Sequence, residues 1–236
     1  MMAEEMSERT DLIVMARDDE TSKPRSLKRM TQAERTALSD SRMYDAAIKL
    51  ICEIGTHNTT LKDIGERAGY SRGLASNRFG SKDALFANLI HNFNTRWADQ
   101  LEQHLAEHSG LSSIFAALKS VEDFLIEESD YMRAMYILWY EAIGSHSEVR
   151  VRLTEYHRAY RRDVAEWVLR GQEEGTIVAH IDPDQYAVQY CSFVFGTIYQ
   201  WLVAPEAIDV RRAFADYRQF TRWLLTPPGT PPTAPE

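Results

Sequence analysis

The sequence lacks most of the features by which enzymes, metal proteins and membrane proteins are recognised. It has only two cysteines in 236 residues, Cys52 and Cys191, and both fall inside predicted helices without metal-ligand or redox spacing. No apolar run approaches the ~20 residues needed to span a bilayer. No nucleophile elbow, Ser/His/Asp grouping or phosphate-cradling glycine loop is present. We therefore expect two buried thiols and a protein that is not an enzyme, needs no cofactor or metal and has no membrane partner.

Acidic side chains outnumber basic ones overall, but the balance reverses in one segment near the N-terminus. The formal net charge is −8, and residues 1–20 hold seven acidic side chains against two basic ones. That acidic start is unlike a secretory signal peptide, so we expect a cytoplasmic protein. Residues 21–35 instead hold five basic side chains and one acidic one, as in an arm that contacts the DNA backbone or minor groove, or in a solvated linker. The basic residues of the candidate arm are Lys23, Arg25, Lys28 and Arg29.

Helical periodicity is what the chain has in abundance. Apolar side chains recur at three and four residues, and no segment alternates as a strand would, so we predict an all-α fold. Residues 1–35 lack periodicity and residues 226–236 hold five prolines, which predicts disorder at both ends. The later predicted helices cover residues 82–107, 112–128, 131–143, 148–174, 183–203 and 207–225.

A short helix and a tight turn are predicted after residue 59. Thr60 and Asp63 fit a capping box, in which the hydroxyl takes an orphan backbone donor. Gly69 can adopt the left-handed conformation that ends a helix at little cost. Upstream, an apolar stripe closed by Gly55 predicts a preceding helix, which carries Met43, Ala46, Ala47, Leu50, Ile51 and Ile54.

A second short helix follows the turn. Ser71 is a natural cap for a helix over residues 72–79, and Ser81 is a cap for a further helix that begins with Lys82. Two short helices around a turn, the second with a polar and basic outer face, are the layout of a helix-turn-helix, whose second helix enters the DNA major groove. The alternative is a generic corner between helices of an all-α protein.

Residues 41–89 resemble the TetR/AcrR family of one-component transcriptional regulators. The resemblance implies an all-α homodimer with an N-terminal DNA-binding domain and a larger helical effector domain. It also implies that binding of a small ligand releases the protein from its operator. One position departs from the family, because Ser76 stands where a phosphate-binding Tyr is common. The matching residues are Ala46-Ala47, Gly55, Thr59-Thr60, Ile64, Ala68-Gly69-x-Ser71-x-Gly73 and Phe79-Gly80-Ser81-Lys82-x-x-Leu85.

DNA contacts are expected from the second helix of this motif and the residues around it. Arg72 and Asn77 are predicted to read base edges, because Arg pairs well with guanine and Asn with adenine. Other polar residues are predicted to hold phosphates and set the register of the protein on the duplex. These are Thr60, Ser71, Ser76, Arg78 and Lys82.

The last two predicted helices, over residues 183–203 and 207–225, carry more large apolar side chains than one packing face needs. Such a broad stripe either fills the core of the domain or forms an interface, and the resemblance places a four-helix dimer interface here. We predict the interface. Its candidate residues are Tyr190, Phe193, Gly196, Trp201, Tyr217 and Phe220.

The middle helices are rich in aromatic and methionine side chains. Most of these must be ordinary core, but a surplus of such residues is also how an apolar ligand cavity is lined. The candidate pocket residues are Phe124, Met135, Trp139, Tyr140 and Tyr160.

These features together predict a dimeric, ligand-responsive transcriptional regulator, most often a repressor, that binds a palindromic operator of double-stranded DNA. We predict an arm (1–35), a DNA-binding domain (36–90), an effector-binding and dimerisation domain (91–225) and a tail (226–236). Two alternatives stay open at this point. One is a helical protein–protein interaction module, and the other is a metal-responsive regulator that uses His104 and His108, which lie four residues apart.

Overall fold

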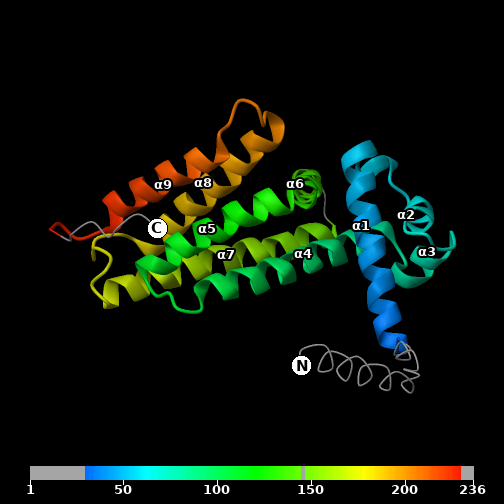
Figure 1. The fold of residues 1–236 in the computed structure, drawn as a ribbon, viewed down its shortest axis with the longest axis horizontal. Helices are drawn as coiled ribbons and strands as arrows, with labels where there is room; N and C mark the ends of the chain where they lie inside the picture. The colour runs from blue at the N-terminus through cyan, green and yellow to red at the C-terminus, as the bar shows by residue number, and fades with distance from the viewer. Residues whose placement is uncertain (1–29, 145–146, 230–236) are drawn as a thin grey trace, which may run out of the picture. The chain divides into compact units, whose positions relative to one another are not determined.

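The structure, a computed structural model, describes residues 30–144 and 147–229. Contacts divide the chain into two compact units, residues 1–37 and residues 38–236. Within the described ranges every regular element is an α-helix (Figure 1), which confirms the predicted all-α class. The helices are α1 (Gln32–Asn58), α2 (Leu61–Arg67), α3 (Leu74–Phe79), α4 (Lys82–Leu105), α5 (Leu111–Glu127), α6 (Ser129–Ile143), α7 (Glu148–Glu173), α8 (Pro183–Val203) and α9 (Val210–Leu225).

The first unit contributes the start of α1. The Glu34 N–H donates to Thr31 Oγ1 at 3.2 Å, and the Glu34 carboxylate accepts from the Thr31 N–H at 2.6 Å. This capping box starts α1 at Gln32, inside the predicted arm. The predicted arm residues Lys23, Arg25, Lys28 and Arg29 lie outside the described residues, as does most of the predicted tail.

In the second unit, α2, α3 and the part of α1 from residue 38 onward enclose a small apolar core. α1 is interrupted at Gly55, whose φ of 74° lies in the left-handed region that glycine adopts without strain. The interruption turns the chain toward α2. The fully buried members of this core are Met43, Ala47, Ile51, Ile64, Ala75 and Leu85.

The remaining helices form a bundle, in which α7 packs against α4 and α8 while α5 packs against α4 and α9 (Figure 1). The turn before α5 lies very close to α7, because a side chain on Gly110 would meet the backbone of Gly171 at 2.7 Å. Only glycine fits there, and its φ of 55° adds to that requirement. Large buried members of the bundle core are Leu118, Phe124, Leu125, Met135 and Phe214.

A buried carboxylate joins α5 to α9. Glu122 is only 4% exposed, and its Oε2 accepts from Nη1 of Arg218 at 3.0 Å. Arg211 lies further away, with its Nη1 at 3.8 Å from Glu122 Oε1, and is largely exposed. The two arginines compensate the buried charge and hold α9 in register on α5.

Several helix ends differ from the prediction. α3 begins at Leu74 rather than at residue 72, and α4 ends at Leu105 rather than at residue 107. α9 begins at Val210 rather than at residue 207, because Asp209 supplies its cap by accepting from the Arg212 N–H at 3.0 Å. The cap decided where α9 begins, whereas periodicity located the helix.

Candidate DNA-binding surface and ligand cavity

The corner between α2 and α3 is built from local capping contacts. The Asp63 N–H donates to Thr60 Oγ1 at 3.2 Å, and the Thr60 hydroxyl donates to the Asp63 carboxylate at 2.6 Å. Gly69 has a φ of 81°, and the next N–H, of Tyr70, bonds back to the carbonyl of Gly65 at 2.9 Å. The predicted capping box and helix-ending glycine are confirmed.

The predicted capping role of Ser71 is wrong. The Leu74 N–H bonds to the backbone carbonyl of Ser71 at 3.0 Å, so residues 71–74 form a turn before the helix. The N-cap of α3 is Gly73, which has no side-chain capping bond. A turn that already satisfies the first helical N–H through a carbonyl leaves the Ser71 hydroxyl exposed rather than engaged as a cap.

Four of the predicted DNA-contacting residues lie on an exposed surface at or just before α3. These are Ser71, Arg72, Ser76 and Asn77. The Arg72 guanidinium forms an ion pair with Glu66 of α2, and its side chain remains 72% exposed. An exposed ion pair of this kind is weak, so the guanidinium can exchange its partner for a DNA base or phosphate.

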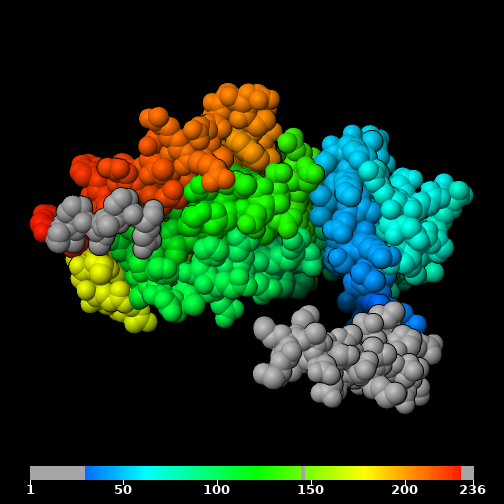
Figure 2. Space-filling view, in the orientation of Figure 1, coloured from blue at the N-terminus to red at the C-terminus, as the bar shows by residue number. Residues whose placement is uncertain are grey.

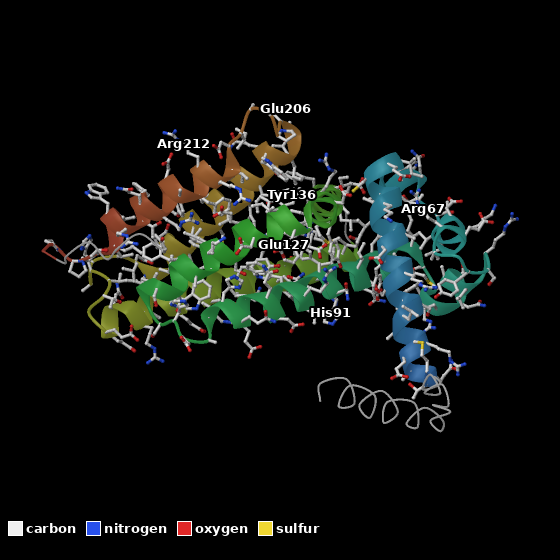
Figure 3. The ribbon with its side chains drawn as sticks, in the orientation of Figure 1. Arg67, His91, Glu127, Tyr136, Glu206 and Arg212 are labelled. Atoms are coloured by element: carbon white, nitrogen blue, oxygen red, sulfur yellow. The ribbon has the colours of Figure 1, made fainter. Side chains whose placement is uncertain are left out.

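Two other predicted phosphate contacts are engaged with the protein itself. The Arg78 guanidinium faces α1, with Nη1 at 3.5 Å from Asp40 Oδ1. The Lys82 ammonium donates to the carbonyls of Thr56 and His57, at 3.0 and 3.3 Å, where α1 ends. Both cations stabilise the way in which α1 packs on the neighbouring segments. Neighbouring Arg67 of α2 likewise extends toward α1 (Figure 3), where it pairs with Glu53 at 2.5 Å.

The α4–α8 part of the bundle encloses a cavity of about 80 Å³. Its wall is mainly aromatic and aliphatic, and two predicted pocket residues, Trp139 and Tyr160, belong to it. The lining residues are Phe93, Trp97, Leu101, Ala117, Val121, Met132, Tyr136, Trp139, Tyr160, Asp163, Val164, Trp167, Tyr190, Cys191, Val194, Phe195 and Ile198.

The other three predicted pocket residues lie elsewhere. Phe124 and Met135 are at most 2% exposed and belong to the packed core. Tyr140 is 51% exposed and contacts the ring of Tyr199, at 5.1 Å between centroids. Helical spacing placed these side chains on apolar faces, but it did not show which face meets the cavity. The residues that the prediction missed, such as Phe93 and Trp97, carry the same spacing signal.

Most polar groups of the cavity wall are satisfied by the protein. The hydroxyl of Tyr136, a residue inside the bundle (Figure 3), donates to the carbonyl of Phe195 at 3.0 Å. The hydroxyl of Tyr160 donates to the side-chain oxygen of Asn94. Burial raises the pKa of both phenols, so they stay protonated at neutral pH. Asp163, partly exposed, pairs with Arg162 at 2.9 Å.

The predicted interface helices, α8 and α9, lie on the outer surface (Figure 2), and several of their apolar side chains are exposed. Of the six predicted residues, Phe220 is 50% exposed, whereas Phe193, Gly196, Trp201 and Tyr217 are partly buried and Tyr190 is 5% exposed and lines the cavity. The ring of Phe193 stacks on that of Tyr217 at 3.6 Å. The prediction for Tyr190 is therefore wrong, because its own bundle covers it. The exposed apolar residues of α8 and α9 are Val188, Tyr199, Val203, Phe220 and Trp223.

His104 and His108 do not share a helix face, because α4 ends at Leu105. His104 Nε2 lies 3.6 Å from Asp123 Oδ2, and His108 lies in the turn beyond the helix. Over residues 30–144 and 147–229, no group of three or more potential metal ligands is close enough to hold an ion. No helix in these ranges is long and apolar enough to cross a membrane.

Comparison with known proteins agrees with this geometry. Residues 43–89 match the family described as bacterial regulatory proteins, tetR family. The HTH-type transcriptional regulator TtgR of Pseudomonas putida is 25% identical over 183 residues, which cover 72% of this chain and 83% of that protein.

Solved structures show the same fold over most of the chain. The SmeT–triclosan complex superposes with a TM-score of 0.70 at 22% identity, covering 84% of this chain and 97% of that one. NalD, the secondary repressor of the MexAB-OprM multidrug efflux pump in Pseudomonas aeruginosa, superposes with a TM-score of 0.67 at 19% identity, covering 84% of this chain and all of that one.

Proposed function

Because the chain belongs to the TetR family of transcriptional regulators, we propose that it is a repressor that binds a palindromic operator as a homodimer and leaves it when a small effector fills the bundle cavity. It acts in the cytoplasm, where it meets DNA. The observation that carries the proposal is the coexistence, in one chain, of an exposed recognition helix and an apolar cavity in the domain that follows it.

The exposed residues of the α2–α3 corner supply the DNA contacts. Arg72 and Asn77 read base edges, and Thr60, Ser71 and Ser76 hold phosphates. Arg78 and Lys82 reach phosphates by exchanging the contacts with α1 described above. The predicted domain division, with DNA binding in residues 36–90 and effector binding and dimerisation in residues 91–225, is part of the proposal.

The exposed apolar face of α8 and α9 forms the dimer interface. Trp223 is 77% exposed and Val203 is 66% exposed, and burying such side chains between two copies would remove a large apolar area from water. A two-fold dimer places two copies of α3 in successive major grooves on one face of the duplex, which requires a palindromic site.

The apolar wall of the cavity supports a small effector with an aromatic or otherwise apolar body. The structurally similar SmeT was solved as a complex with triclosan, which supports a small-molecule ligand in a bundle of this fold. An effector that binds better to a conformation in which the two recognition helices no longer match the groove spacing lowers operator affinity by its difference in affinity for the two states.

Selection of bound fragments from random and genomic DNA tests the proposal. The wild-type protein is expected to select a palindrome, and the Trp223→Glu variant is expected to be monomeric by light scattering and to lose that selection. A matched control is Val151→Glu, which places the same charge at a 60% exposed position on α7, a helix that is not part of the proposed interface. Binding without sequence preference, or a monomeric wild type that still selects a palindrome, would contradict the proposal.

A further inference from the structure

Two hydrogen-bond donors in the cavity wall stand apart from the satisfied groups described above. Trp139 on α6 and Tyr190 on α8 both line the cavity. The indole N–H of Trp139 and the hydroxyl of Tyr190 are buried and have no hydrogen-bond partner among the residues that the structure describes. Native proteins seldom leave buried polar groups unsatisfied, so a pair in one cavity wall points to a ligand that completes them.

The chemistry of the two groups determines what that ligand must offer. An indole nitrogen is a donor only, so it requires an acceptor. Burial raises the pKa of the Tyr190 hydroxyl well above its usual range, which keeps its proton in place as a second donor. Each group can therefore be satisfied by an oxygen acceptor such as a carbonyl.

The charges around the cavity favour an uncharged ligand. Among its lining residues, all of which are described, there is no Lys, Arg or His, so an anion would lose its hydration without gaining a cation as a partner. The single carboxylate, of Asp163, is already paired with Arg162. A cation would gain attraction from the aromatic faces, but it would meet the positive ends of the N–H and O–H dipoles.

We propose that the cavity binds an uncharged, mainly apolar molecule that carries a hydrogen-bond acceptor, and that Tyr190 and Trp139 are the donors available to it. The aromatic wall accommodates the apolar body of the ligand, and the two donors fix its orientation. This inference rests on the proposed function, because it specifies the chemical class of the effector.

Four probes that share one branched heavy-atom skeleton on a benzene ring test the class of ligand. They are acetophenone as the neutral acceptor, cumene as the hydrocarbon, benzoate as the anion and benzamidinium as the cation. Calorimetric titration of the full-length protein should show acetophenone binding about tenfold more tightly than cumene, because cumene leaves both donors unsatisfied. Benzoate and benzamidinium should both bind more weakly than acetophenone.

The residue assignment is tested with Tyr190→Phe and a matched control. Tyr190→Phe removes only the hydroxyl, so it should reduce the preference for acetophenone over cumene several-fold while leaving cumene affinity unchanged. The control is Tyr186→Phe, four residues earlier on α8, because the Tyr186 hydroxyl donates to Thr221 Oγ1 at 3.3 Å and the residue does not line the cavity. It should keep the wild-type preference, and unchanged cumene affinity shows that each variant retains the cavity.

Four results would overturn the inference. These are equal affinity for cumene and acetophenone in the wild type, an undiminished acetophenone preference in Tyr190→Phe, tightest binding by a charged probe, and binding of none of the probes.

Operator binding is measured separately, on DNA selected by the wild-type protein. Tyr190-dependent binding of acetophenone that leaves DNA affinity unchanged would support the ligand class and contradict the effector role. Failure to select DNA would contradict the proposed function alone.

Discussion

The corner formed by α1, α2 and α3 and the bundle formed by α4 to α9 differ in how accessible their polar side chains are. In the corner, Arg72, Arg78 and Lys82 all have protein partners, but these partners are surface carboxylates or helix-end carbonyls that can be exchanged. In the bundle, some polar groups are buried and paired, as at Glu122, and others are buried without any partner among the described residues, as at Tyr190. One region thus keeps its polar groups available to a large charged partner, and the other encloses them around space for a small one.

The largest expected effect concerns the buried charge of the bundle. Arg218→Ala removes the nearer partner of Glu122 and leaves that carboxylate buried, so the free energy of unfolding should fall by about 2–3 kcal/mol. That value is below the range for a fully buried pair, because Arg218 is partly exposed and Arg211 remains nearby.

The measurement is urea unfolding followed by circular dichroism. Arg211→Ala is the matched control, because it removes the more distant and exposed arginine of the same helix and should cost well under about 1 kcal/mol. Equal losses of unfolding free energy in the two variants would mean that the Glu122 pair is no stronger than an exposed ion pair of the corner. The proposed difference between the two regions would then be wrong.

The next effect concerns the exchangeable pairs of the corner. Arg72→Ala should weaken operator binding by about 1–3 kcal/mol and relax the preference at one base position, because the guanidinium is proposed to leave Glu66 for a guanine edge. Mobility-shift titration on single-base operator variants measures both.

Glu66→Gln sharpens the same test by releasing Arg72 from its ion pair without removing it. Operator affinity should hold or rise, since the competing carboxylate is gone. A loss as large as that of Arg72→Ala would show that the pair is a structural requirement. An equal loss on every DNA sequence in Arg72→Ala would assign this residue to a phosphate instead.

A smaller effect separates the satisfied from the unsatisfied tyrosines of α8. Tyr186→Phe should lower the free energy of unfolding by about 1 kcal/mol, because it leaves the fully buried Thr221 hydroxyl without this hydrogen bond. Tyr190→Phe should leave stability unchanged or raise it slightly, because it removes a buried hydroxyl that has no partner among the described residues. Thermal unfolding without ligand measures both, and a clear destabilisation by Tyr190→Phe would reveal a partner for that hydroxyl.

The smallest effect is a pH dependence of the bundle. Burial, with a contribution from Arg161, lowers the pKa of His157 below its usual value of about 6.5. The unfolded chain therefore takes up a proton on His157 at a higher pH than the folded chain does. As a result, the stability contributed by the neutral, buried His157 is complete above about pH 6.5 and is lost as the pH falls below it. His157→Phe should lose stability less steeply than the wild type between about pH 6.5 and 5, as measured by urea midpoints. Equal pH slopes of the urea midpoint in the two proteins would exclude His157 as a source of the pH dependence.

Much of the fold was predictable because its signals are local. The capping box at Thr60 and the cap at Ser81 each depend on residues three apart, and both form. The same local logic failed at Ser71, where a backbone turn satisfied the N–H that a side-chain cap would have taken. A capping residue in the sequence shows that a side-chain cap can form, but a competing backbone hydrogen bond can prevent it.

The sequence by itself determined the helices, the helix-turn-helix corner and the resemblance to the TetR family, because periodicity, caps and motif spacing are properties of neighbouring residues. Only the tertiary structure decided that Trp139 and Tyr190 share a cavity wall while Phe124 and Met135 fill the core. It also decided that Arg78 and Lys82 turn toward α1. The physical reason is that a helical pattern fixes which side chains share a face, but the face that each helix presents to its neighbours, and the space left between them, depends on how all the helices pack together.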